Sequence, residues 1–119
     1  MKLKYKDIAP YRAAQLIKQN YCCALCGDVV TDDAVLDHCH KTGLLRKVLH
    51  RGCNSMLGKI ENNMLRSKIT MDRLEVFAQQ LIEYITTQHT EAIHPTYKTK
   101  EERAMKKKRG GGRGGGRGR

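Results

Sequence analysis

The clearest apolar pattern lies in the second half of the chain. Between residues 70 and 87, apolar side chains recur three and four positions apart, which places them on one face of a helix. Thr70 is a favourable N-cap, and Asp72 complements the helix dipole in the first turn. We therefore expect a helix over 70–87 whose apolar face belongs to the core or to a dimer interface. That face comprises Leu74, Phe77, Ala78, Leu81, Ile82 and Ile85.

Shorter apolar runs separated by turn residues occupy the first half. Pro10 suits a first helical turn and Asn20 can end a helix. Two apolar runs flank the polar connection at 40–43 and are typical of paired strands. The expected elements are a helix over 10–20, extended pieces within 29–36, a returning strand over 44–49, and a helix from about Cys53.

Charge is concentrated at the C-terminal end. Of the net charge of +11, residues 98–119 carry +8, from ten Lys and Arg against two Glu. The last ten of these residues are only glycine and arginine, a composition that cannot form a core and predicts disorder. A basic tail suits a polyanionic partner such as nucleic acid. The alternative is a flexible extension that only improves solubility.

The cysteine content indicates a reducing compartment. Five cysteines occur without a secretory leader and without an apolar run long enough to span a membrane, so we expect a cytoplasmic protein that uses thiols for metal binding. The chain has one Phe and no Trp, which leaves little material for a core. Domains of this kind often need a structural metal or a partner subunit.

Two short pairs of soft ligands predict a structural zinc site. Tetrahedral zinc takes four Cys or His ligands that commonly arrive as two pairs from separate turns, and such a site leaves no open position for catalysis. Cys22 would form a less usual spacing, and His38 or His40 could replace His50. The predicted ligands are Cys23, Cys26, His50 and Cys53.

A second group of residues suits a hard metal ion. Asp37 offers a carboxylate and Asn54 an amide oxygen, the ligand type that Mg²⁺ prefers. His38 can accept a proton from water near neutral pH. This chemistry fits hydrolysis of a phosphodiester, although the same residues could form an ordinary polar loop.

The central motifs resemble those of the phage recombination endonuclease VII family, which consists of HNH-like (His-Me finger) nucleases. The family pattern runs CxxC, then DHxHxTGxxRG, then CxxCNxxxG. In this chain residues 36–43 read LDHCHKTG, Arg46 follows, and residues 50–58 read HRGCNSMLG. Three positions depart from the pattern: His50 replaces a cysteine, Lys47 a glycine, and Leu57 an acidic residue of some relatives.

The resemblance implies an α+β fold with a zinc-stabilised ββα-metal core, followed by helices and a disordered basic tail. It implies that Asp37 and Asn54 hold catalytic Mg²⁺, with Mn²⁺ as an alternative, and that His38 is the general base. His40 matches a histidine that assists at the phosphate, although it also stays a candidate zinc ligand. The zinc positions of the family fall on Cys23, Cys26, His50 and Cys53.

The expected protein is a phage-encoded, Mg²⁺-dependent endonuclease acting on branched or distorted DNA, such as a Holliday junction, as a homodimer. Its expected parts are a nuclease core over 1–64, a helical extension over 65–97 that serves dimerisation, and a disordered tail over 98–119.

Two other functions are compatible with the residues. The first is a non-catalytic, zinc-stabilised nucleic-acid-binding module, and the second is an HNH nuclease that does not recognise junctions. The binding module would use the tail together with four basic residues that are also the expected nucleic-acid contacts of the nuclease: Arg46, Lys47, Arg51 and Lys59.

Overall fold

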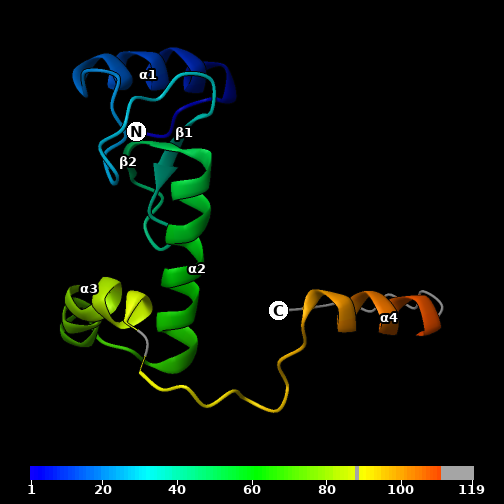
Figure 1. Ribbon diagram of the computed structural model, residues 1–119. Helices are drawn as coiled ribbons and strands as arrows, with labels where there is room; N and C mark the ends of the chain where they lie inside the picture. The colour runs from blue at the N-terminus through cyan, green and yellow to red at the C-terminus, as the bar shows by residue number, and fades with distance from the viewer. Residues whose placement is uncertain (88, 111–119) are drawn as a thin grey trace. The chain divides into compact units, whose positions relative to one another are not determined.

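The computed structural model describes residues 1–87 and 89–110, with the backbone alone for 106–110. Its elements are α1 (Tyr5–Lys18), β1 (Ala34–His38), β2 (Leu45–His50), α2 (Arg51–Ser67), α3 (Met71–Thr86) and α4 (Lys100–Gly110) (Figure 1). The chain divides into two compact units, Met1–Phe77 and Ala78–Arg119. Helices together with one small antiparallel sheet confirm the mixed class, whereas the predicted boundaries after residues 64 and 97 stay predictions.

The two strands form a hairpin whose register changes by one residue in the middle. Up to Leu36 the strands pair in one register, and from His38 they pair in another. Asp37 therefore faces two residues of β2, Arg46 and Lys47. Bulges of this kind bend a strand and re-aim its side chains. Here the first of the two facing residues is half-buried and the second is exposed.

A tight loop closes the hairpin at the predicted polar connection. The N–H of Cys39 donates to the carbonyl of Leu44 at 2.9 Å, and the N–H of Gly43 donates back to the carbonyl of Cys39 at 2.7 Å. Gly43 has a φ of +78°, a left-handed conformation that glycine adopts without a steric penalty. The loop thus returns the chain directly after His38.

Helix α1 begins five residues earlier than the sequence analysis predicts. The Asp7 carboxylate accepts a hydrogen bond from the N–H of Lys4 at 2.9 Å, which caps the helix before Tyr5. Pro10 consequently lies inside the helix, where it forfeits a single backbone hydrogen bond close to the exposed N-terminal end. The predicted stop is confirmed, because Asn20 is left-handed with a φ of +55°.

The next two helices match their predicted positions closely. Helix α2 begins two residues before the predicted start and ends at Ser67, where the C-cap residue Lys68 is left-handed with a φ of +55°. The N–H of Ile69 then bonds the carbonyl of Met64 at 2.9 Å, which satisfies a carbonyl at the helix end. Thr70 caps α3 as predicted, because its hydroxyl accepts from the N–H of Arg73 at 3.3 Å.

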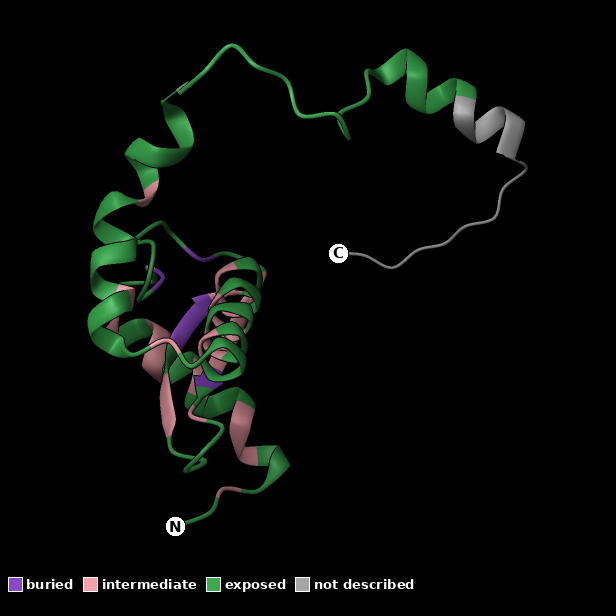
Figure 2. Cartoon of the chain, turned by 90° about the horizontal axis from the view of Figure 1, so that it is seen from below, coloured by how far each residue is buried: buried purple, intermediate pink, exposed green. Residues whose placement is uncertain are grey.

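The core is small and lies around β2. The buried apolar residues are Cys23, Val30, Val48 and Leu49. Against Cys23, Val30 and Leu49 pack the partly buried residues Leu16, Ala34, Cys53 and Leu57. In Figure 2 the buried residues gather at the hairpin and the turn beside it, and α1 and α2 both pack against the hairpin. This confirms the expectation of a thin core. None of the described helices is both long and apolar enough to cross a membrane.

The charged segment after residue 98 contains a helix that the sequence analysis did not predict. Thr99 and Glu102 form a reciprocal cap: the Thr99 hydroxyl accepts from the N–H of Glu102 at 3.1 Å, and the Glu102 carboxylate accepts from the N–H of Thr99 at 2.8 Å. Hydrogen bonding of the Glu102 carboxylate to the backbone N–H of Thr99, with a smaller contribution from the Thr99 side chain, lowers the pKa of Glu102. Prediction of disorder from charge alone overlooked this cap, whereas the predicted disorder of 111–119 lies outside the described residues.

The outer edge of β2 is covered by the side chain of Gln19, the C-cap residue of α1. The Gln19 amide oxygen accepts from the N–H of Val48 at 2.9 Å, and its nitrogen donates to the carbonyl of Val48 at 2.9 Å and to that of Cys22 at 2.8 Å. This side chain replaces a neighbouring strand at a fully buried residue.

We expect Gln19→Ala to lower the free energy of unfolding by about 1–3 kcal/mol, because it leaves the buried N–H of Val48 without its partner, whereas the Val48 carbonyl still accepts from the N–H of Ala24. Urea unfolding of the zinc-loaded protein measures the change. Gln79→Ala, the same substitution at an exposed helical position, should shift stability by no more than about 0.5 kcal/mol. Equal losses in the two variants would contradict the role of Gln19.

Candidate metal centres

A knuckle-shaped turn between α1 and the hairpin presents the first pair of soft ligands. The N–H of Cys23 donates to the carbonyl of Asp28 at 2.8 Å, and the N–H of Gly27 donates to the carbonyl of Cys23 at 3.0 Å. Gly27 has a φ of +85°, which lets the chain reverse immediately after Cys26. Both thiols are therefore held on one short, hydrogen-bonded turn.

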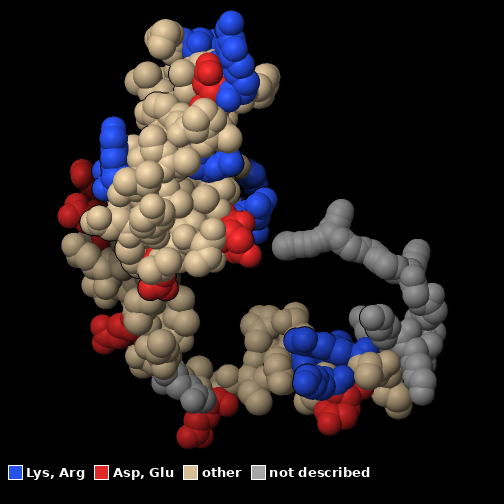
Figure 3. Space-filling view, turned by 90° about the horizontal axis from the view of Figure 1, so that it is seen from above, with Lys and Arg blue, Asp and Glu red and all other residues tan. Residues whose placement is uncertain are grey.

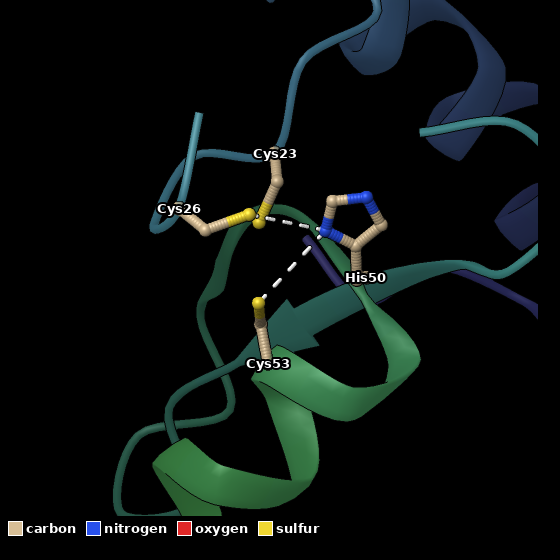
Figure 4. A group of neighbouring side chains, drawn as sticks. All are labelled: Cys23, Cys26, His50 and Cys53. Atoms are coloured by element: carbon tan, nitrogen blue, oxygen red, sulfur yellow. Dashed lines mark hydrogen bonds between the residues drawn. The ribbon is translucent and has the colours of Figure 1, made fainter. Parts of the chain in front are cut away.

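The second pair comes from the junction of β2 and α2. His50 ends the strand and is the N-cap residue of the helix, and Cys53 lies in the first helical turn. The strand end and the helix start thus bring two residues of the sequence to the same place. Figure 4 shows the four side chains converging, two from the knuckle and two from this junction.

The ligand atoms are spaced as a tetrahedral metal site requires. All four lie within 4.8 Å of one another. His50 Nδ1 is 3.3 Å from the Cys26 sulfur and 3.8 Å from the Cys53 sulfur (Figure 4). A zinc tetrahedron with metal–sulfur bonds of about 2.3 Å has edges of about 3.8 Å. The donor set and its dimensions therefore fit structural zinc.

The tautomer of His50 also suits a metal ligand. Its Nε2 lies 3.0 Å from the carbonyl of Val29, which can accept only from a protonated nitrogen. A proton on Nε2 leaves the lone pair of Nδ1 directed at the cysteines. Hydrogen bonding to Val29 and to the thiols of Cys23 and Cys26 raises the pKa of His50 to about 9.

The cysteines differ in how easily they ionise. Burial opposes ionisation of Cys23, but hydrogen bonds from the backbone of Cys26, His50 and Leu25 prevail and lower its pKa to about 6. Burial and the neighbouring thiols raise the pKa of Cys53 to about 11. A metal must displace protons from His50 and Cys53, so its binding weakens as pH falls.

The structure resolves two alternatives that the sequence left open. The Cys22 thiol donates to the carbonyl of Asn20 at 3.4 Å and is absent from the cluster. His38 and His40 are also absent from it. The two histidine rings instead contact each other edge to face, with centroids 4.7 Å apart and an interplanar angle of 77°. The four residues brought together are the four predicted from spacing.

Asp37 lies at the second candidate site and is the sole buried charged residue among those described. The Arg46 guanidinium binds it through two hydrogen bonds: Nε to Oδ2 at 2.6 Å and Nη2 to Oδ1 at 3.3 Å. Arg46 also donates to the Glu61 carboxylate at 3.0 Å. Hydrogen bonds to Glu61 and Asp37 raise the pKa of Arg46, which stays charged.

The other predicted residues of this site lie on neighbouring elements. His38 follows Asp37 at the end of β1 and is exposed, as is His40 in the hairpin loop. Asn54 is half-buried in the first turn of α2, which packs against both strands. Within the described residues no hydrogen bond joins Asn54 to Asp37. The carboxylate and amide oxygens are a suitable donor set for a hard divalent ion.

The predicted nucleic-acid contacts fall into two kinds. Lys47, Arg51 and Lys59 are exposed, whereas the Arg46 guanidinium is occupied by two carboxylates. On the face in Figure 3, Lys and Arg form several separate groups with Asp and Glu between them. The body of the protein therefore does not present one continuous basic surface on that face.

Two residues that position these sites, Glu61 and Gln19, were not predicted from the sequence. Glu61 lies seven positions after Asn54, so both occupy one face of α2. That spacing could have identified it. Gln19 carried no comparable signal, because its partner Val48 is 29 positions away and contributes only backbone atoms.

Comparison with known families confirms the resemblance that the central motifs indicate. The family described as recombination endonuclease VII matches residues 1–87, which covers α1, the hairpin, α2 and α3. No curated protein matches the chain.

We expect Cys23→Ser to lower bound zinc from about one equivalent per chain to near zero and to unfold the knuckle, because the site would lose a thiolate. Zinc content after dialysis and circular dichroism measure these effects. Cys22→Ser changes the adjacent cysteine and should retain zinc. If both variants retain it, or if the Cys22 variant alone loses it, the ligand assignment is wrong.

Proposed function

Because this chain belongs to the recombination endonuclease VII family, we propose that it hydrolyses phosphodiester bonds in branched or distorted DNA and depends on a divalent metal ion. The observation that carries the proposal is the adjacency of Cys53 and Asn54 at the start of α2. A zinc ion bound by Cys53 would fix the helix start that presents the Asn54 amide. The hairpin with α2 would then form the ββα-metal core of His-Me finger nucleases.

Asp37 and His38, which are adjacent at the end of β1, would have different roles in the reaction. The buried Asp37 and the half-buried Asn54 would hold Mg²⁺ or Mn²⁺. The ion would stabilise the charge that develops on the phosphate and on the leaving oxygen. His38 is exposed beside Asp37, so it can reach a water molecule and take its proton. His40 contacts the His38 ring and would orient it or assist at the phosphate.

DNA would approach the face that carries these histidines. The exposed side chains of Lys47, Arg51 and Lys59 would contact the phosphate backbone, which contributes affinity without sequence preference. The basic C-terminal segment from residue 98 would add to this affinity. Paired cleavage of two strands at a branch would use two active sites, which a dimer would supply.

Helix α3 is the proposed dimerisation element. Its apolar stripe is largely exposed: Phe77 is 59%, Ile82 70% and Ile85 66% accessible. Apolar surface on this scale is unusual for a monomer with so small a core. A second copy of the chain would cover the stripe by packing α3 against its own counterpart.

A non-catalytic nucleic-acid-binding module is the competing function. The observation in its favour is that the Arg46 guanidinium already neutralises Asp37. A carboxylate paired in this way could serve only to hold the hairpin together. Cleavage of branched DNA in the presence of Mg²⁺ separates the two functions.

We expect the protein with Mg²⁺ to cleave a four-way DNA junction faster than a matched linear duplex, and His38→Ala to lower this activity by about 10²–10⁴-fold, because it removes the general base. The variant should keep its zinc and its circular dichroism spectrum. His89→Ala, at another exposed histidine, serves as the control and should cleave normally.

Three outcomes of this experiment are informative. Full activity in the His38 variant would exclude His38 as the base. Equal cleavage of junction and duplex would favour a nuclease without junction specificity. Binding without cleavage of any DNA would favour the non-catalytic module.

For the dimer, we expect Ile82→Asp to shift the protein from dimer to monomer at micromolar concentration, because a buried unpaired carboxylate opposes association. Sedimentation velocity measures the mass. Gln79→Asp adds the same charge outside the stripe and should leave the dimer intact. A monomeric parent protein would rule out α3 as a dimer interface under these conditions.

A further inference from the structure

One guanidinium bridges three elements at the proposed active site. Arg46 on β2 binds Asp37 on β1 at 2.6 Å and Glu61 on α2 at 3.0 Å, and its Nη2 donates to the carbonyl of His38 at 3.3 Å. The hairpin bulge places Arg46 opposite Asp37, and α2 supplies the second carboxylate. The proposed metal ligand and proposed base are thus both tied to one cation.

The two carboxylates are in different surroundings. The side chain of Asp37 is 8% exposed, whereas that of Glu61 is 38% exposed. Asp37 accepts from Arg46 through both of its oxygens. A divalent ion that binds Asp37 must therefore share it with a positive guanidinium, which repels the ion at short range.

Glu61 can relieve this competition. Its two oxygens accept from Arg46 Nη1 at 3.0 Å and from Nη2 at 3.4 Å. The Nη2 that contacts Asp37 Oδ1 thus has Glu61 as a further acceptor beside the His38 carbonyl, so Arg46 can release this oxygen and keep a carboxylate partner. The negative charge of Glu61 also offsets the positive charge that Arg46 brings to the site.

We propose that Glu61 is a positioning residue that controls divalent-ion affinity at Asp37 by offering Arg46 a second carboxylate, so that the weakly bound Oδ1 of Asp37 can be released to the ion. The inference rests on the proposed function, since it concerns the same metal site. Glu61 has no place in the motifs that the sequence shares with the family, where the acidic position falls on Leu57. Glu61 lies one helical turn further along α2 and acts through Arg46.

The experiment measures Mn²⁺ binding to the zinc-loaded protein, from the electron paramagnetic resonance signal of free Mn²⁺, in a buffer without chelator so that zinc is retained. We expect Glu61→Gln to weaken Mn²⁺ binding by about 10–100-fold, because the neutral amide holds Arg46 less well. Glu75→Gln removes an exposed carboxylate from α3 and is the matched control. It should bind Mn²⁺ as the parent protein does.

A double-mutant comparison tests whether Glu61 acts through Arg46. In an Arg46→Gln background, Glu61→Gln should change Mn²⁺ affinity less than about threefold, since the guanidinium is gone. An undiminished drop would overturn the proposal and indicate a general effect of charge. If Arg46→Gln loses zinc, Arg46→Lys provides the background, because a lysine cannot bridge both carboxylates in the same geometry.

Failure of this inference is distinguishable from failure of the proposed function. A parent protein whose Mn²⁺ binding is insensitive to Asp37→Asn would overturn both. Mn²⁺ binding that is lost in Asp37→Asn but unchanged in Glu61→Gln would overturn the role of Glu61 alone. A Glu61→Gln protein that loses its zinc would also overturn it, because Glu61 would then be a structural residue.

Discussion

The convergence of three thiols and one imidazole is the constraint on which the rest of the first unit depends. A core built around four buried apolar residues cannot by itself hold α1, the hairpin and α2 in register. The four ligands join the knuckle after α1 to the junction of β2 and α2. Metal bound there would convert a weak set of apolar contacts into a defined arrangement, because the binding free energy becomes folding free energy.

The same arrangement connects structural chemistry to the proposed catalytic chemistry. Cys53 and Asn54 are successive residues in the first turn of α2, so whatever fixes the thiol also fixes the amide. Within the hairpin, the bulge places Arg46 and Lys47 opposite Asp37, and Arg46 binds this carboxylate while Lys47 stays exposed. The soft and the hard ligands can therefore lie close together and still bind different metals, because thiols favour zinc and carboxylates favour Mg²⁺.

Charge balance distinguishes this site from a simple pair of oxygen ligands. Asp37 is buried, and the Arg46 guanidinium provides a compensating positive charge. That compensation also competes with a metal, which gives Glu61 its proposed importance. Asp37 and the more exposed Glu61 share the Arg46 guanidinium. In the proposed arrangement, the affinity of Asp37 for a metal therefore depends on Glu61, although Glu61 need not touch the metal.

Local patterns in the sequence were sufficient for the candidate zinc ligands, for the start of α2 and for the position of α3. Ligand spacing and helical periodicity are properties of neighbouring residues, so Cys23, Cys26, His50 and Cys53 could be identified without a fold. Only the tertiary structure decided that Arg46 binds Asp37 and Glu61, and that Gln19 covers the edge of β2. Those contacts depend on a register shift and on the packing of α1 and α2 against the hairpin. Such relations between distant residues leave no periodic signal in one sequence.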